Sequence, residues 1–354
     1  MMLSGAIQKL VKGYNLEENE IKGAMNLIME GNATPAQIGS FITALSIKGE
    51  TIDEITGCAK VMREKAFQLQ PKVGYFIDTC GTGGDGANTF NISTAAAFVA
   101  AAGGVTVAKH GNRSVSSRSG SADVLEALGV NISLEPEKVG LCIEQTGMGF
   151  MFAPSFHKSM KYAAEPRREL GIRTVFNILG PLTNPAGAKG QVMGVFKREL
   201  TEPLAHVLLK LGVERAMVVH GSDGLDEVTT TGITYVSEVR DERVINYELH
   251  PGSFGLSIAD KTELSGGDAS TNAQIIQEIF EGVRGPRRDI VLMNAAAALY
   301  VGKVAGDMRE GIWMAAEIID SGRAMAKLQE LRLFTNRTGE GMQTLLSFVP
   351  RIDC

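Results

Sequence analysis

The feature that most constrains this chain is a run of glycines between two apolar stretches. Residues 81–86 contain four glycines, after an apolar stretch at residues 74–77 and before an alanine-rich stretch at residues 95–102. Because glycine has no Cβ, several backbone NH groups of such a loop can approach one anion. The pattern predicts a strand, a phosphate-binding loop and a helix, which together form a unit of an α/β fold. A glycine turn with a purely structural role is the alternative.

A second anion site is predicted at the start of that helix. Asn91, Ser93 and Thr94 place side-chain donors just before residues 95–102. The first NH groups of a helix have no intrahelical partners, and the helix dipole favours negative charge there. Two neighbouring anion sites suggest a substrate that is phosphorylated at two ends.

The glycines also match the dinucleotide-binding pattern G-x-G-x-x-G, at Gly81, Gly83 and Gly86. That pattern is weak alone, because the fold also requires a helix that starts at the third glycine and an acidic residue about 20 residues further on. Here the helix is expected later, and the next predicted strand is followed by Lys109 and Arg113. Cations suit a phosphate rather than a ribose diol, so we favour a phosphate site.

Composition excludes several classes of protein. The chain has 354 residues, of which 44% are hydrophobic and 21% charged, as in soluble globular proteins. No apolar run is long enough to span a membrane, and residues 1–14 lack the apolar block of a signal peptide. The net charge of −5 argues against general affinity for nucleic acid, and the four cysteines show no spacing typical of disulfides or zinc. We expect a cytoplasmic protein without nucleic-acid or membrane partners.

Helix signals dominate the first part of the chain. Thr34 followed by Pro35 is typical of a helix start, and Thr51 with Glu54 forms a capping box. Apolar residues recur at helical spacing on both sides of these signals. The pattern predicts four short helices within residues 3–70.

Strands alternate with helices in the rest of the chain, which predicts an α/β domain with a mainly parallel central sheet. The predicted strands are residues 75–77, 105–108, 148–152, 191–195, 216–220 and 233–238. We therefore predict a small all-helical domain at residues 1–72, to which residues 160–188 return. The large α/β domain is predicted at residues 73–159 and 189–354.

A donor-rich segment follows the second predicted strand. Residues 109–123 contain two glycines and five serines, together with Lys109, Arg113 and Arg118. The segment precedes a helix predicted at residues 122–128. Such a density of donors and cations favours a lid over a phosphate, and a solvated serine-rich turn is the alternative.

Two adjacent carboxylates follow the apolar strand at residues 217–219. These are Asp226 and Glu227, in a turn that also contains glycines. Mg²⁺ prefers one or two carboxylates together with waters and substrate phosphates, and Ser93 would add a hydroxyl if the two loops converge. The sequence therefore predicts a magnesium site, with a surface acidic turn as the alternative.

Six segments resemble successive motifs of the anthranilate phosphoribosyltransferases, in both order and spacing. They are residues 81–85, 91–94, 109–114, 119–123, 173–186 and 225–227. The resemblance covers nearly the whole chain. It implies a small helical domain and a large α/β domain of the nucleoside phosphorylase and phosphoribosyltransferase class, and a homodimer formed through the helical parts. It also implies transfer of the phosphoribosyl group of phosphoribosyl pyrophosphate (PRPP) to anthranilate, in tryptophan biosynthesis.

The resemblance also implies roles for individual residues. Those expected to bind PRPP are Gly81, Gly84, Asp85, Thr89, Asn91, Ile92, Ser93, Thr94, Lys109, His110, Gly111, Asn112, Arg113, Ser114, Val115, Ser116, Ser117 and Ser121. Those expected to contact anthranilate are Gly81, His110, Asn112 and Arg167. The implied Mg²⁺ ligands are Ser93, Asp226 and Glu227. No side chain is assigned as a general acid or base.

Alternatives remain at this stage. A pyrimidine nucleoside phosphorylase would share the glycine loop and the serine-rich segment, but it would have little need for Asp226 and Glu227. A non-catalytic, nucleic-acid-binding relative would carry a basic surface, which the net charge opposes. Arg168 and Arg173 are close rivals of Arg167 for the anthranilate carboxylate.

Overall fold

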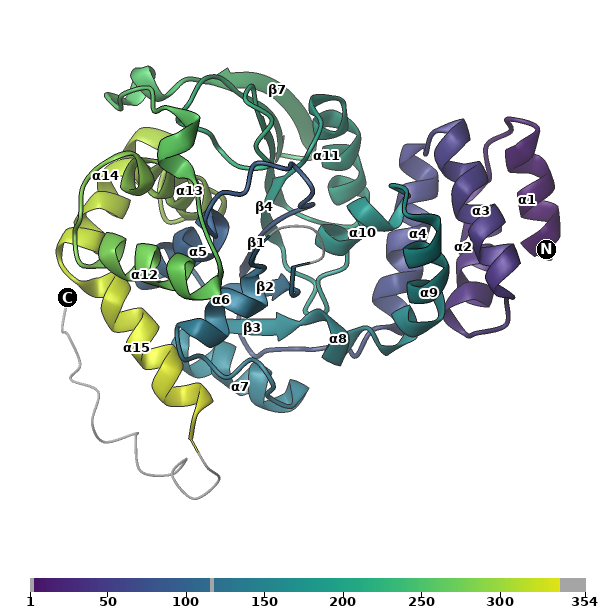
Figure 1. Ribbon diagram of the computed structural model, residues 1–354, viewed down its shortest axis with the longest axis horizontal. Helices are drawn as coiled ribbons and strands as arrows, with labels where there is room; N and C mark the ends of the chain where they lie inside the picture. The colour runs from purple at the N-terminus through teal and green to yellow at the C-terminus, as the bar shows by residue number, and fades with distance from the viewer. Residues whose placement is uncertain (1–2, 115–117, 338–354) are drawn as a thin grey trace.

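The computed structural model describes residues 3–114 and 118–337. A small bundle of helices lies at one end of the molecule, and a larger body of strands and helices forms the rest (Figure 1). In the described residues, no helix has both the length and the apolar character needed to cross a bilayer.

The elements follow one another from the helical bundle to the sheet and then to a group of helices. The α-helices are α1 Leu3–Val11, α2 Glu18–Met29, α3 Pro35–Lys48, α4 Ile52–Lys65, α5 Ile92–Ala102, α6 Ser121–Ala127, α7 Pro136–Thr146, α8 Ala153–Phe156, α9 Lys161–Leu170, α10 Phe176–Leu182, α11 Thr201–Lys210, α12 Ala269–Phe280, α13 Pro286–Val301, α14 Met308–Asp320 and α15 Arg323–Thr335. The strands are β1 Ile77–Gly81, β2 Val107–Gly111, β3 Met148–Phe152, β4 Gly190–Gly194, β5 Arg215–Gly221, β6 Thr234–Arg240 and β7 Arg243–Leu249.

In the described part of the chain, seven strands form one sheet in the order β3-β2-β1-β4-β5-β6-β7. The first five strands of this order are parallel to one another, whereas β6 is antiparallel to β5 and β7 is antiparallel to β6. The predicted fold class, a helical domain with a large α/β domain and a mainly parallel sheet, is therefore confirmed. The chain leaves β1 toward β2 on one side and returns to β4 on the other. Such a reversal opens a crevice at the carboxyl ends of the two strands.

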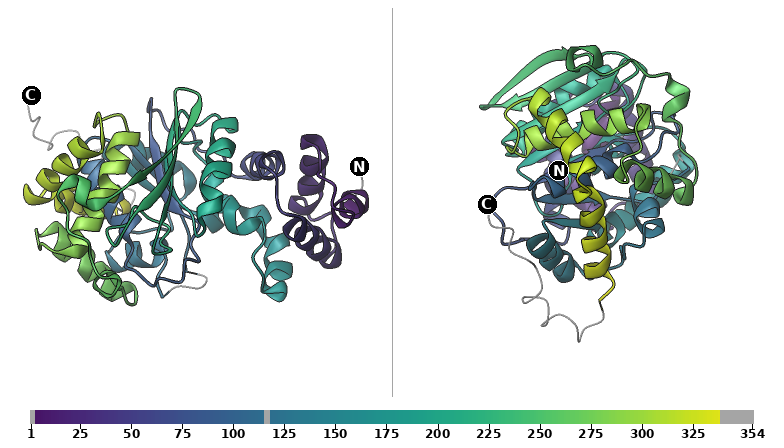
Figure 2. Two further views of the ribbon diagram at one scale, coloured as in Figure 1. Left: turned by 90° about the horizontal axis from the view of Figure 1, so that it is seen from above. Right: turned by 90° about the vertical axis from the view of Figure 1, so that its left-hand side faces the viewer.

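Helices cover both faces of the sheet (Figure 2). Successive residues of β5 point to opposite faces, so Met217 and Val219 join one core and Ala216 and Val218 join the other. The first core contains α5, α13, α14 and α15, and the second contains α10, α11 and the helical bundle. Burial on both faces explains why the parallel strands have apolar sequences.

The predicted helix signals of the bundle are present. The Thr34 hydroxyl accepts a hydrogen bond from the Gln37 amide, and Thr51 and Glu54 form a reciprocal capping box. The bundle also receives a later segment, because α9 lies beside α2 and α3 (Figure 1). This contact adds α9 to the helical bundle.

The bounds of three predicted elements are wrong, and one strand was not predicted. The strand predicted at residues 105–108 is β2, Val107–Gly111. The helix after the glycine loop begins at Ile92 rather than at residue 95, and β1 starts at Ile77 and continues through polar residues to Gly81. Those polar residues remain buried because Asp78 accepts hydrogen bonds from the His110 amide and from Asn184. The edge strand β7 was missed, since its exposed polar sequence lacks an apolar run.

Candidate active site

The site forms where the carboxyl ends of β1 and β4 meet. Gly81 and Gly194 end these strands as register partners, and both pack against Asp226. A Cβ on Gly81 would lie 2.3 Å from Asp226 Oδ2, and one on Gly194 would lie 1.5 Å from the Asp226 carbonyl oxygen. The two glycines therefore allow the segment after β5 to enter the crevice at the topological switch point.

The glycine loop presents free backbone amides next to this segment. Gly83, Gly84 and Gly86 have φ values of 66°, 76° and 72°, a region that favours glycine. The Gly83 amide donates to Asp226 Oδ2 at 2.8 Å. In the described residues, the amides of Gly84, Asp85 and Gly86 have no acceptor. Three successive free NH groups can serve one anion.

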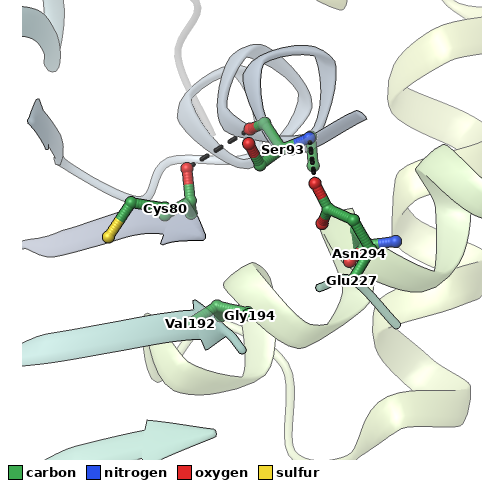
Figure 3. Close-up of a pocket in the computed structure, with 8 residues that line it drawn as sticks. Cys80, Ser93, Val192, Gly194, Glu227 and Asn294 are labelled. Atoms are coloured by element: carbon green, nitrogen blue, oxygen red, sulfur yellow. Dashed lines mark hydrogen bonds between the residues drawn. The ribbon is translucent and has the colours of Figure 1, made fainter. Parts of the chain in front are cut away.

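The start of α5 converges with the second carboxylate. The Ser93 amide donates to Glu227 Oε1 at 3.1 Å, so Ser93 and Glu227 adjoin (Figure 3). Asn91 precedes the helix and links two other segments, since its Nδ2 donates to the Ser119 carbonyl and its Oδ1 accepts from Asn272. Thr94 is buried, and its hydroxyl has no partner among the described residues.

The carboxylates of this cluster repel one another. Burial and the neighbouring Asp85 raise the pKa of Asp226 to about 7. Burial and Asp226 raise the pKa of Glu227 well above its usual range, although Lys109 opposes the shift. Clustered carboxylates that resist ionisation fit a divalent cation. In the part of the chain that the structure describes, no group of three or more acidic, His or Cys side chains forms a metal cage, so such an ion would need ligands from substrate and water.

Lys109 and His110 lie in β2 beneath the loops. Lys109 is only 1% exposed, and its ammonium group donates to the Thr79 carbonyl. The His110 amide donates to Asp78 Oδ1 at 3.1 Å, and Asn184 donates to the other Asp78 oxygen at 2.7 Å. The charge of Lys109 therefore acts from the floor of the site.

The donor-rich segment is folded back onto α6. Asp123 accepts hydrogen bonds from the Ser114 and Gly120 amides at 3.0 and 2.9 Å. Arg113 pairs with Asp123 and with Glu126, so its guanidinium is held on the side of α6. Val115, Ser116 and Ser117, all predicted to bind PRPP, lie outside the described residues.

The remaining predicted PRPP residues lie around the same loops. Gly111 packs against Ser121, because a Cβ on this glycine would lie 2.3 Å from Ser121 Oγ. The Asn112 carbonyl accepts from the Ala122 amide at 3.2 Å. Thr89 forms an isolated backbone bridge with Ser265. The Ile92 side chain belongs to the core, so only its backbone faces the loops.

Two of the residues predicted to contact anthranilate lie next to α10. The Arg167 guanidinium lies over the Phe176 ring, 5.0 Å from its centroid, and burial lowers its pKa. In the described residues, no carboxylate pairs with Arg167. His110 packs against the α10 carbonyl of Gly180, and burial with the neighbouring His157 lowers its pKa to about 3. A neutral imidazole and a guanidinium without a carboxylate partner among the described residues thus both contact α10.

Several residues that shape the site were not predicted. Gly194 and Asn184 act through packing and hydrogen bonds to partners distant in sequence, and no local pattern marks them. Asn294 was detectable, because it is a lone amide in the apolar sequence of α13. It joins Thr79, Ser93 and Glu227 around a small cavity beneath the site (Figure 3).

Comparisons with known proteins agree with this architecture. Residues 74–325 match the model "Glycosyl transferase family, a/b domain", and residues 4–66 match "Glycosyl transferase family, helical bundle domain". The chain is 69% identical to an anthranilate phosphoribosyltransferase of Acetivibrio thermocellus, over 95% of this chain and 97% of the relative.

Solved structures of anthranilate phosphoribosyltransferases are also similar to this chain. The crystal structure of anthranilate phosphoribosyltransferase from Thermus thermophilus superposes with a TM-score of 0.90 at 44% identity, over 94% of this chain and 99% of that one. The Saccharomyces cerevisiae enzyme in complex with PRPP and Mg superposes with a TM-score of 0.87 at 29% identity, over 94% and 97% of the two chains.

Proposed function

The chain belongs to the anthranilate phosphoribosyltransferase family, and we propose that its crevice transfers the phosphoribosyl group of PRPP to the amine of anthranilate. Pyrophosphate is the second product, and the reaction is a step of tryptophan biosynthesis. The observation that carries the proposal is the meeting of free loop amides with half-buried carboxylates at the switch point. This combination suits a metal-bound pyrophosphate.

The chain assists the departure of pyrophosphate chiefly through charge. The amides of Gly84, Asp85 and Gly86 and the buried ammonium of Lys109 face the side where negative charge develops. Loss of one such preorganised donor typically costs roughly 3 to 4 kcal/mol of transition-state stabilisation. The anthranilate amine attacks the anomeric carbon from the opposite face. Because an arylamine is weakly basic, its proton leaves readily after bond formation, and no side chain is needed as general base.

The donor set fits Mg²⁺, with Ser93, Asp226 and Glu227 as proposed ligands. The raised carboxylate pKa values and the contact between Ser93 and Glu227 support this choice. When bound, the ion would neutralise part of the negative charge on the leaving pyrophosphate.

Arg167 is the proposed partner of the anthranilate carboxylate. It is half-buried and unpaired within the described residues, whereas Arg168 is exposed and near Glu165. A guanidinium binds a carboxylate through two parallel hydrogen bonds. We propose that Gly81, His110 and Asn112 complete the acceptor pocket.

The other roles in PRPP binding are proposed from position. Gly81, Gly84 and Asp85 would surround the pyrophosphate. The start of α5 and the donor-rich segment would hold the ribose and its 5′-phosphate. Thr89 would lie near the pyrophosphate loop, and the Lys109 ammonium would act on the departing pyrophosphate. The other residues assigned to PRPP are Asn91, Ile92, Ser93, Thr94, His110, Gly111, Asn112, Arg113, Ser114, Val115, Ser116, Ser117 and Ser121.

We further propose a cytoplasmic homodimer, joined through the helical domains. Ile47, Val11 and Tyr14 are 82%, 72% and 63% exposed on the bundle. The segments that carry these side chains adjoin, because α1 packs against α3 and Lys48 donates to Asn15, which follows α1. The domain division would assign residues 1–72 and 160–188 to the bundle and residues 73–159 and 189–354 to the α/β body. Light scattering of the purified protein would test the dimer.

The activity is tested by anthranilate fluorescence in a mixture of protein, PRPP and Mg²⁺. We expect the signal to fall with stoichiometric release of pyrophosphate, and EDTA to stop the reaction. A constant signal with folded protein would overturn the proposal, and phosphorolysis of a pyrimidine nucleoside would then be assayed.

A further inference from the structure

We propose that Arg173 is a positioning residue that sets the orientation of the Gly84–Asp85 peptide, and through it the affinity of the glycine loop for the pyrophosphate end of PRPP. The inference rests on the proposed function and extends it to a residue in the turn between α9 and α10. Arg173 donates from Nη2 to the Gly84 carbonyl. This contact joins two segments that are 89 residues apart in sequence.

An aromatic ring supports the guanidinium of Arg173. Arg173 lies over the ring of Phe196, 4.1 Å from the ring centroid. Phe196 is itself tied to the glycine loop, because its amide donates to Thr82 Oγ1 at 3.2 Å. Stacking on an aromatic ring restricts the guanidinium to one plane, from which its fork reaches the carbonyl.

The bonded carbonyl determines the direction of the next amide. In a trans peptide the C=O and the following N–H point in opposite directions, so a carbonyl held by Arg173 turns the Asp85 N–H away from it. The Asp85 amide has no acceptor in the described residues and is available to an anion. Positive φ values at Gly83, Gly84 and Gly86 show that the loop is built from residues with unrestricted torsions. Such a loop gains most from an external contact that selects one peptide orientation.

The backbone of Arg173 is anchored to the helical bundle. Ser46 of α3 donates from its hydroxyl to the Arg173 carbonyl at 3.1 Å, and the next amide, of Thr174, donates to Asn177 Oδ1 at 2.9 Å. The side chain and the backbone of one residue thus connect the bundle to the loop. No carboxylate among the described residues pairs with Arg173, so its charge also favours an anion at the loop.

The test compares three proteins. Arg173→Ala removes the contact, Arg173→Lys keeps one cationic donor, and Arg309→Ala is the matched control. Arg309 makes the same kind of contact on α14, with a donated bond to the Ser253 carbonyl and a ring, that of Phe254, beneath its guanidinium. The readouts are KM for each substrate, kcat, Tm, and calorimetric binding of pyrophosphate with Mg²⁺.

We expect Arg173→Ala to raise KM for PRPP and Kd for pyrophosphate about tenfold, with KM for anthranilate within about twofold of wild type. Arg173→Lys should recover part of both losses, and Arg309→Ala should match wild type in every readout. A rise in KM for anthranilate alone would make Arg173 a substrate ligand and overturn the inference. The inference would also be overturned if Arg173→Ala bound pyrophosphate like wild type, or if a lowered Tm of this variant accounted for its whole change in KM and Kd. An inactive wild type would refute the proposed function, whereas the pyrophosphate titrations would still decide the role of Arg173.

Discussion

Asn294 holds the backbone of Val228 from both sides. Its Oδ1 accepts from the Val228 amide at 2.9 Å, and its Nδ2 donates to the Val228 carbonyl at 2.9 Å. A third bond, to the Ile290 carbonyl, ties the amide to its own helix α13. Val228 directly follows Glu227, so a single buried side chain fixes the end of the acidic segment.

Replacement of Asn294 by Ala should therefore affect both stability and metal use. It leaves two buried backbone groups without partners, and each costs about 1 to 3 kcal/mol. We expect a Tm several degrees lower and a higher Mg²⁺ concentration for half-maximal activity. The control is Gln274→Ala, which removes a surface amide paired with Glu278. An unchanged Mg²⁺ requirement would show that the acidic segment holds its place without Asn294.

Gly194→Ala should be among the most damaging single-methyl changes. The added Cβ would overlap the Asp226 carbonyl at 1.5 Å, and backbone cannot move aside as a flexible side chain can. Overpacking of this kind typically costs about 1 to 3 kcal/mol, and occasionally more. Denaturant unfolding measures the change. Gly23→Ala in α2 is the control, because it meets nothing within 4 Å and should stabilise its helix by up to about 1 kcal/mol.

Asp226→Asn combined with Glu227→Gln should separate folding from activity. Burial and, after it, repulsion between carboxylates raise both pKa values. Neutral amides remove both costs, so the metal-free protein should unfold at the same or a higher temperature. Turnover should fall at least about tenfold at limiting Mg²⁺, and the upward shift of Tm on addition of Mg²⁺ with PRPP should be lost. Wild-type kinetics in this variant would refute the metal assignment.

His157 should contribute to the loss of stability in acid. Burial lowers its pKa to about 4, below its unfolded value near 6.5. The folded protein therefore favours the neutral ring of His157. The contribution of this preference to the free energy of unfolding is full above about pH 6.5 and is lost as the pH falls toward 4. Its upper limit is roughly 3 kcal/mol.

The measurement is the difference in Tm between pH 7 and pH 5. His157→Phe keeps a ring without a titrating group, so its difference should be smaller than that of wild type, even if its Tm at pH 7 is lower. His206→Gln in α11 is the control, and its difference in Tm between pH 7 and pH 5 should equal that of wild type. Equal differences in all three proteins would contradict the prediction.

Arg167→Lys should raise KM for anthranilate and leave KM for PRPP nearly unchanged. Lysine keeps the charge but loses the two parallel donors of the guanidinium and its stacking on Phe176. We expect an effect of about tenfold or more in kcat/KM for anthranilate. Arg168→Lys should behave as wild type, because that side chain is exposed near Glu165. If instead Arg168→Lys raised KM for anthranilate and Arg167→Lys did not, Arg168 would be the partner of the anthranilate carboxylate.

Local patterns were reliable where the cause was local. The capping box of Thr51 and Glu54 and the cap at Thr34 act within one helical turn, and both are present. The start of α5 was misplaced because Ser93 and Thr94 resemble capping residues, yet the Ser93 amide bonds to Glu227, which is 134 residues away. A distant carboxylate thus allowed the helix to begin earlier than its own sequence indicated.

The sequence by itself determined the α/β class, the helical front and the chemistry of the loops, since periodicity, caps and glycines act through neighbouring residues. Only the tertiary structure decided that β1 and β4 lie side by side, that Asp226 rests on Gly81 and Gly194, and that Arg173 reaches Gly84. These contacts depend on strand order and on packing between distant segments. The free energy of each arises from burial and hydrogen bonds that exist only once the sheet has formed.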